Sequence, residues 1–180
     1  MLFMNSKKIF TEWVMPIGLA VILVLLIREF LFFQVSVPTK SMYPTIKTGD
    51  RIIVSRVYKK EKLQRGDIVV FYSKELDKTL IKRLIGLPGD NVVVDIDGRV
   101  HINGKEIDER YVVYNGGKTG EYKVPKGCYF FLGDNRANSW DARYWNQAYI
   151  SEDDIKGKAQ FIVFPFSRAG KFKIGESVEK

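Results

Sequence analysis

The stretch Val35-Ser-Val-Pro-Thr-Lys-Ser-Met-Tyr-Pro-Thr45 decides how the chain is organised. It follows the most hydrophobic part of the sequence and precedes Gly49-Asp50, so it marks the change from an apolar segment to a folded domain. Ser41 lies at its centre, between Val37-Pro38 and Tyr43-Pro44, and proline keeps the backbone on both sides out of a helix. We therefore expect a turn that presents the serine hydroxyl, although most clusters of this composition are ordinary turns.

The segment before this stretch predicts a membrane anchor. Residues 13–27 carry no charge, and the apolar character resumes at 30–33 after Arg28-Glu29, which brings the span to the ~20 residues that a membrane-crossing helix needs. Lys7 and Lys8 precede it and favour a cytoplasmic N-terminus. A cleaved signal peptide and a buried core helix are the alternatives, but no small-x-small cleavage site follows the run. We expect a cytoplasmic N-terminus (1–9), a single-pass anchor (10–33) and an extracytoplasmic domain (34–180).

The remainder of the sequence predicts a mainly β domain. β-branched and aromatic residues dominate its apolar runs, and Asp97-Gly98 and Asn103-Gly104 are dipeptides that two-residue hairpins prefer. The expected fold is one N-terminal transmembrane helix followed by a coiled β-sheet or barrel-like domain with a small β-ribbon. The expected strands cover 51–58, 67–72, 80–85, 91–96, 99–102, 105–107, 128–132 and 159–164, and 140–146 is expected to form a helical turn.

Composition limits the function classes. A chain of 180 residues with 46% hydrophobic residues has room for one anchor and one compact domain. The net charge of +8 could suit nucleic acid, but no run of five basic residues occurs, and anionic lipid explains the charge equally well. Cys128 is the only cysteine, so an intramolecular disulfide and a cysteine metal cluster are excluded.

A serine nucleophile needs a base, and the sequence offers two candidates. His101 is the only histidine, and it lies within the predicted ribbon, where a strand residue is expected. Lys82 could act instead if burial held it neutral near physiological pH. It alternates with Leu80 and Leu84 on one face of a predicted strand, between apolar neighbours. The alternative is an edge-strand lysine whose stem lies across the sheet.

Five segments, read together, resemble the conserved boxes of bacterial type I signal peptidases. These are Ser-Lys membrane proteases of the S26 family, which remove signal peptides from exported proteins. The resemblance extends from the apolar N-terminal segment to Pro165 and so covers nearly the whole chain. The segments are 38–45, 49–51, 65–71, 81–90 and 133–143.

The resemblance implies a role for each matching residue. Ser41 is the expected nucleophile and Lys82 the expected general base, with Ser139 orienting the lysine. The Thr39 hydroxyl and the Ser41 N–H are expected to form the oxyanion hole. The expected structural supports are an ion pair between Asp141 and Arg143 and the turn at Gly133, Asp134 and Asn135. The expected substrate-binding residues are Val37, Pro38, Met42, Leu80 and Ile81.

Two departures and one insertion qualify the match. Lys40 and Ala142 stand where the family often has glycine and serine, and neither change removes a catalytic group. The family carries a cap between the lysine and the Gly133 turn, and here it is expected at about 91–125, as little more than the hairpin at 95–107. A monomer that needs no metal or cofactor and binds no nucleic acid is expected.

Several alternatives remain open. The expected activity is cleavage after small-x-small sites in exported preproteins. A self-cleaving repressor protease would share the dyad, but this chain has an anchor where such proteins carry a DNA-binding domain. A maturation peptidase dedicated to one substrate cannot be separated by sequence. A membrane-tethered binding protein without catalysis would have no reason to retain both Ser41 and Lys82.

Overall fold

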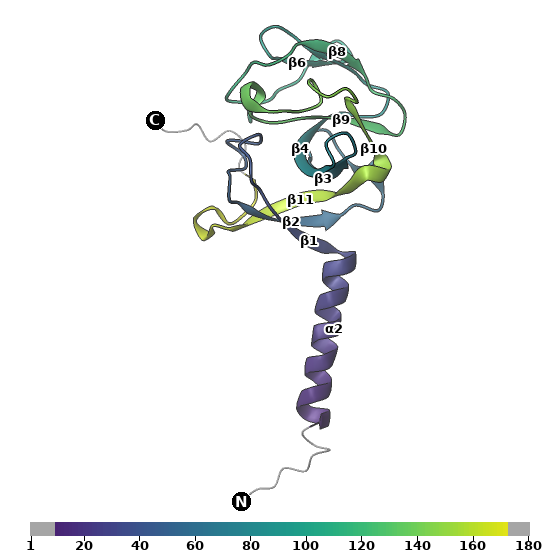
Figure 1. The fold of residues 1–180 in the computed structure, drawn as a ribbon, viewed down its shortest axis with the longest axis vertical. Helices are drawn as coiled ribbons and strands as arrows, with labels where there is room; N and C mark the ends of the chain where they lie inside the picture. The colour runs from purple at the N-terminus through teal and green to yellow at the C-terminus, as the bar shows by residue number, and fades with distance from the viewer. Residues whose placement is uncertain (1–9, 173–180) are drawn as a thin grey trace, which may run out of the picture. The chain divides into compact units, whose positions relative to one another are not determined.

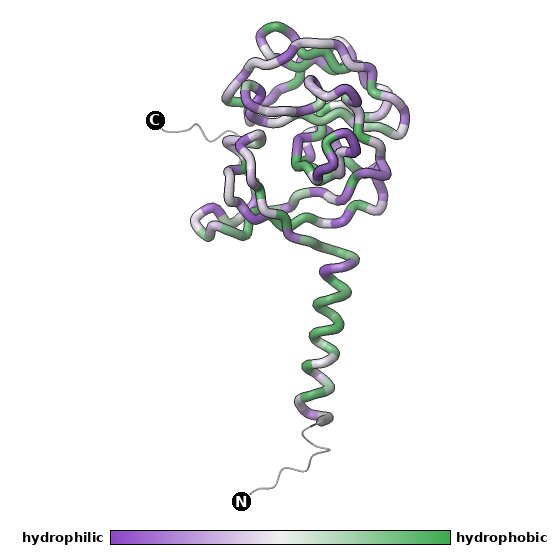
Figure 2. The backbone as a smooth tube through the Cα atoms, in the orientation of Figure 1, coloured by the Kyte–Doolittle hydropathy of each residue, from purple (hydrophilic) through white to green (hydrophobic). Residues whose placement is uncertain are grey.

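The computed structural model describes residues 10–172, and the chain divides into two compact units at Phe33 and Gln34. In the first unit, the π-helical turn η1 (Phe10–Val14) leads into the α-helix α2 (Met15–Phe30). The span Glu12–Phe30 has a mean hydropathy of 2.0 and is long and apolar enough to cross a membrane (Figure 2). The predicted cytoplasmic segment, with Lys7 and Lys8, lies outside the described residues.

The second unit is built on a seven-stranded sheet in the order β1-β2-β11-β3-β4-β9-β10 (Figure 1). The pairings from β2 to β10 are antiparallel. The prediction of a mainly β fold after an apolar helix is therefore confirmed. The strands are β1 (Phe32–Ser36), β2 (Arg51–Arg56), β3 (Ile68–Ser73), β4 (Lys78–Gly86), β9 (Cys128–Leu132), β10 (Tyr149–Ser151) and β11 (Ile155–Phe164).

A second, four-stranded sheet has the order β7-β6-β5-β8. It is larger than the expected hairpin, because β8 (Gly120–Lys123) pairs with the outer side of β5 (Asn91–Val94). The other two strands are β6 (Val100–Ile102) and β7 (Lys105–Glu106). In Figure 1 the labels β6 and β8 lie at the opposite end of the β domain from β2 and β11.

The two sheets share one hydrophobic core. Val92 and Val100 of the small sheet belong to the same buried cluster as Phe71 and Phe131 of the large sheet. The rings of Phe71 and Phe131 stack with centroids 4.3 Å apart, and full burial of such a side chain stabilises a fold by about 1.5–3 kcal/mol. The segment that resembles a cap is therefore part of the domain's core.

Two local predictions were wrong, and the α-helix is shorter than the predicted anchor. Residues 140–146 form turns, and the helical turn occurs earlier, as η3 (Arg136–Asn138). The α-helix ends at Phe30, and Phe32 already begins β1, since aromatic residues suit a strand as well as an anchor. The last long strand, β11, begins at Ile155, four residues before its predicted start at 159.

Candidate active site

Lys82 lies in the interior of the large sheet. It belongs to β4, which has β3 on one side and β9 on the other, and Val69 of β3 is its register partner. The residue is only 4% exposed, so the edge-strand alternative is wrong. Burial lowers the pKa of Lys82 to about 8, with Arg143 acting in the same direction and the carboxylates of Asp141 and Asp134 opposing it.

Ser41 lies in a tight turn that is bonded to the Gly133 segment. The backbone is a turn, as expected, but the residue is 8% exposed, so its side chain is largely covered. The Asn135 N–H donates to the Ser41 carbonyl at 3.1 Å, and Asn135 Nδ2 donates to the Lys40 carbonyl at 3.2 Å. The exposed Thr39 places its Oγ1 3.4 Å from Ser41 Oγ. The two hydroxyls therefore lie side by side.

Gly133 is the point where the predicted catalytic residues meet. Leu132 lies opposite Arg83, and extending this antiparallel register by one residue places Gly133 opposite Lys82. A Cβ atom added at Gly133 would lie 2.1 Å from Ser139 Oγ and 2.4 Å from the Ser41 carbonyl oxygen. Only a residue without a side chain fits there. Ser41, Lys82 and Ser139 come from distant parts of the chain and gather around this glycine.

The hydroxyl of Ser139 is buried and has no hydrogen-bond partner among the described residues. Buried hydroxyls are nearly always bonded, so an unpaired one marks a place where a polar group can be received. Asn135 Oδ1 is also buried and has no hydrogen-bond partner among the described residues. The side of the Gly133 turn that faces Ser41 therefore offers free acceptor capacity.

Two buried ion pairs hold the turn. Arg143 binds Asp141 through Nε at 2.8 Å and Nη2 at 2.9 Å, and Asp141 Oδ2 also accepts the Gly133 N–H at 3.0 Å. Arg83 binds Asp134 through Nε at 2.7 Å and Nη2 at 2.6 Å. All four side chains are at most 6% exposed. Bidentate arginine–carboxylate pairs fix geometry as well as charge, so both ends of the turn are rigidly placed.

Sequence reasoning assigned no role to two residues of this network, Arg83 and Thr45. Arg83 follows Lys82 and points away from it, toward Asp134 and the Gly66 carbonyl. Thr45 Oγ1 donates to Asp134 Oδ2 at 2.6 Å and so joins the Ser41 turn to the same carboxylate. Strand alternation does predict that Arg83 points away from Lys82, but no local pattern indicates the partner of Thr45.

The predicted substrate-binding residues differ in their exposure. Met42 is 0% exposed and Val37 is 2% exposed, so both side chains are buried in the unbound domain, and their contact with a substrate stays a prediction. Pro38 is exposed, and Leu80 and Ile81 are half-buried. These three remain available to a bound peptide.

The histidine is not part of the group of residues around Gly133. His101 is in β6, as expected, with Nε2 3.1 Å from Asp95 Oδ2. Across residues 10–172, no group of three or more His, Cys, Asp or Glu side chains could hold a metal ion.

Comparison with known proteins identifies the family. Residues 10–164 match the family model described as signal peptidase, peptidase S26. The chain belongs to this family. The predicted resemblance and the prediction that the chain is a peptidase are confirmed.

Signal peptidase relatives match over nearly their full length. Signal peptidase I P of Bacillus subtilis subsp. natto is 41% identical, over 94% of this chain and 96% of its own. Signal peptidase I T of Bacillus subtilis (strain 168) is 40% identical, over 94% and 93%. Signal peptidase IB of Staphylococcus aureus (strain COL) is 36% identical, over 89% and 93%.

Proposed function

We propose that this chain is a membrane-anchored serine endopeptidase that removes signal peptides from exported preproteins with Ser41 and Lys82. The observation that carries the proposal is the burial of Lys82 inside the sheet, opposite the glycine that contacts Ser41 and Ser139. A lysine whose pKa is lowered to about 8 supplies a neutral amine near physiological pH. Membership of the signal peptidase family supplies the substrate class.

The chemistry proceeds in two steps. Neutral Lys82 accepts the proton of Ser41 Oγ, which attacks the carbonyl carbon at the cleavage site. The tetrahedral oxyanion is held by the Ser41 N–H and the Thr39 hydroxyl. The C–N bond breaks, the proton passes from Lys82 to the leaving amine, and an acyl-enzyme remains. Water, deprotonated by Lys82, then releases the signal peptide as a carboxylate and frees Ser41.

The signal peptide binds in extended form at the edge of the large sheet. The edge strand β1 has β2 as its one neighbour, so its other side can pair with an added strand. Pro38, Leu80 and Ile81 then meet the side chains before the cleavage site. Shallow contacts of this kind reject large residues by steric clash and leave alanine-like residues at the first and third positions.

The helix α2 anchors the enzyme, with the N-terminus in the cytoplasm and the β domain outside. The apolar span Glu12–Phe30 and the preceding lysines support this orientation. Protease protection in sealed vesicles tests it. Digestion of the β domain from the cytoplasmic side would overturn the orientation and leave the reaction untouched.

The decisive experiment is cleavage of a model preprotein with alanine at the first and third positions before the cut. The intact chain in detergent is compared with Ser41→Ala and with Ser167→Ala, a matched control at an exposed serine. Mass spectrometry locates the new N-terminus. Cleavage after alanine by the intact chain and the control, but not by Ser41→Ala, is the expected result.

Two other results would decide against the proposal. Cleavage that survives in Ser41→Ala would remove the nucleophile. No cleavage by the folded intact chain, followed by cleavage of a single exported protein in a screen, would make the chain a dedicated maturation peptidase.

A further inference from the structure

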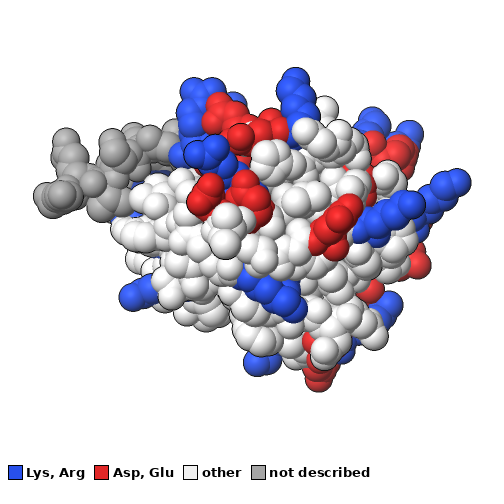
Figure 3. Space-filling model, turned by 90° about the horizontal axis from the view of Figure 1, so that it is seen from above, with Lys and Arg blue, Asp and Glu red and all other residues white. Residues whose placement is uncertain are grey.

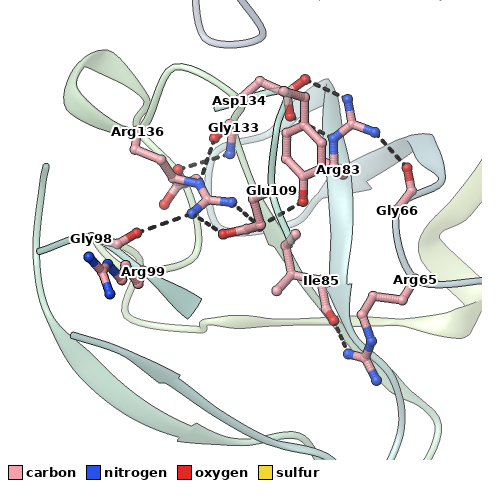
Figure 4. A network of polar contacts seen from close by, with 12 residues as sticks. Arg65, Gly66, Arg83, Ile85, Gly98, Arg99, Glu109, Gly133, Asp134 and Arg136 are labelled. Carbon is pink, nitrogen blue, oxygen red and sulfur yellow. Dashed lines mark hydrogen bonds and ion pairs between the residues drawn. The ribbon is translucent and has the colours of Figure 1, made fainter. Parts of the chain in front are cut away.

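The segment between β7 and β8 places a buried carboxylate against the Gly133 turn. Glu109 lies in this segment, and its side chain is 9% exposed. Figure 4 shows it pointing at the guanidinium of Arg136, whose side chain is 1% exposed. Both carboxylate oxygens are bonded: Arg136 Nη1 donates to Oε2 at 2.8 Å, and Arg136 Nη2 donates to Oε1.

Arg136 connects the Glu109 carboxylate to the Gly133 turn. Its Nε donates to the Gly133 carbonyl at 3.1 Å, and its own carbonyl accepts from Arg143 Nη2 at 2.8 Å. The N–H of Gly133 is bonded to Asp141. The peptide units on both sides of Gly133 are therefore fixed, one by Asp141 and the other by Arg136, whose direction Glu109 sets.

A second contact runs from the same carboxylate to the strand that bears Lys82. The Tyr111 hydroxyl donates to Glu109 Oε1 at 2.6 Å. The Arg83 guanidinium carbon lies 3.8 Å from the centroid of the Tyr111 ring, in cation–π contact. Arg83 directly follows Lys82 on β4, and its guanidinium binds the Asp134 carboxylate. Glu109 is thus connected to the Gly133 turn through Arg136 and to β4 through Tyr111.

We propose that Glu109 is a positioning residue for catalysis, which holds the Gly133 turn, and with it Ser41 and Ser139, through Arg136. This inference rests on the proposed function. Glu109 does not touch the substrate or the reacting atoms. It acts by satisfying a buried cation that binds the Gly133 carbonyl.

Loss of the carboxylate would release that cation inside the domain. A buried arginine without its counter-ion is unfavourable and seeks another acceptor. Asp134 is another carboxylate whose charge acts on Arg136, and it already binds Arg83 and Thr45. Competition for Asp134 would displace the Gly133 turn. A shift of about 1 Å in a catalytic group costs up to about 100-fold in rate.

The test is Glu109→Gln in the full-length chain in detergent, assayed on the model preprotein. The kcat per folded molecule is expected to fall about 10- to 100-fold, with KM changed less than about threefold, because the peptide-binding edge is untouched. Circular dichroism gives the folded fraction. Asp108→Asn is the matched control, since it neutralises the adjacent carboxylate of an exposed ion pair with Arg110, and its kcat should equal that of the parent chain.

Two further variants keep the test decisive. Tyr111→Phe removes only the hydroxyl that helps to hold the Glu109 carboxylate against Arg136, so it tests the orientation of that carboxylate if Glu109→Gln does not fold, and a fall in kcat at constant KM is expected. Arg136→Lys cannot bind Glu109 and Gly133 together. If Glu109 acts through Arg136, the double variant with Glu109→Gln should lose no more rate than the worse single variant.

Several outcomes would overturn the inference. A normal kcat per folded molecule for Glu109→Gln, or for Tyr111→Phe where that variant decides, would leave Glu109 with a purely structural role. Additive losses in the double variant would separate Glu109 from Arg136. Failure of the parent chain to cut the preprotein would overturn the proposed function itself and is distinct from these results.

Discussion

Lys82 combines a buried position with a proposed role as general base, which requires its amine to be neutral. Because burial lowers its pKa to about 8, the neutral fraction rises with pH through that value. We expect kcat/KM for the model preprotein to rise about tenfold per pH unit below pH 7 and to level off above pH 8. Chelators should have no effect. A profile that is flat from pH 5 to pH 9, recorded on protein shown to be folded, would contradict this role.

The same burial means that Lys82 lowers the free energy of unfolding at neutral pH. Between pH 8 and 10.5 the unfolded chain holds the proton and the folded chain does not, so stability rises with pH in this window and the full penalty applies below it. A shift from 10.5 to about 8 corresponds to about 3 kcal/mol. Lys82→Met should therefore abolish cleavage yet raise the free energy of unfolding at pH 7, with little gain near pH 10.5. Urea unfolding at both pH values measures it; equal gains would contradict the buried charge.

Gly133 has no space for a methyl group. In Gly133→Ala the new Cβ would meet Ser139 Oγ and the Ser41 carbonyl, so one of these groups must move. We expect a loss of about 1–3 kcal/mol of stability and of at least about 100-fold in kcat. Asn138→Ala, at an exposed position of the same turn, is the control. Full activity of Gly133→Ala would contradict the close contact of the turn with both serines.

Sequence reasoning could name the groups that would react but not those that hold them. Ser41 and Lys82 stand in recognisable segments, whereas Glu109 acts on Arg136 across a separation that no local spacing reveals. Exposure was also misjudged: prolines indicate a turn at Ser41, but they do not indicate what covers it. Burial depends on which distant segment packs there, and a single sequence does not state that.

At the level of elements, β4 joins Lys82 to the Gly133 turn through Arg83. The arginine fork makes two bonds to Asp134 and a third to the Gly66 carbonyl at 2.7 Å. Lysine keeps the charge but not the fork, so Arg83→Lys should cost about 3 kcal/mol of stability, near the lower limit for breaking a buried pair. Thermal and urea unfolding measure it, with Arg99→Lys, an exposed ion-pair arginine, as the control. An effect no larger than that of the control would show that the fork is dispensable.

The elements that sequence reasoning missed are short or polar. The strand β8 has the sequence Gly-Glu-Tyr-Lys and alternates between half-buried and exposed residues, which a polar loop also does. The strand β10 has three residues, too few for a period to appear. Both form because a neighbouring strand supplies their partners, β5 for the first and β9 for the second. Long apolar strands such as β3 and β4 were predicted because their own side chains favour the sheet.

At the level of the whole β domain, charge and exposed aromatic side chains lead to a prediction of lipid contact. Acidic and basic side chains are interspersed on the face shown in Figure 3, which does not favour nucleic acid. Near the end of β11, Phe164 is 43% exposed and Phe166 is 85% exposed, with rings 5.9 Å apart. Ile162 of the same strand is buried, so β11 packs against the core on one face and exposes the Phe164 ring at its end.

We therefore expect residues 34–180 to bind liposomes that contain anionic lipid. Aromatic side chains enter the interface, and the basic domain is attracted to the headgroups. Phe164→Ser/Phe166→Ser should weaken binding at least about fivefold in sedimentation, since each ring contributes about 1 kcal/mol or more. Tyr58→Ser, at another exposed aromatic residue, is the control. No binding by the parent fragment would exclude lipid contact by this surface.

The shared core and the Glu109–Arg136 pair also bear on how such enzymes diverge and can be recombined. A chimera in which residues 91–125 came from another peptidase would replace part of the shared core and would also remove Glu109 from its pair with Arg136. It would function only if the incoming segment brought a carboxylate for Arg136 and side chains that fill the space around Val92 and Val100. Residues 91–125 and the Gly133 turn should therefore be exchanged together, and changes of specificity should be more accessible at the peptide-binding edge than through this segment.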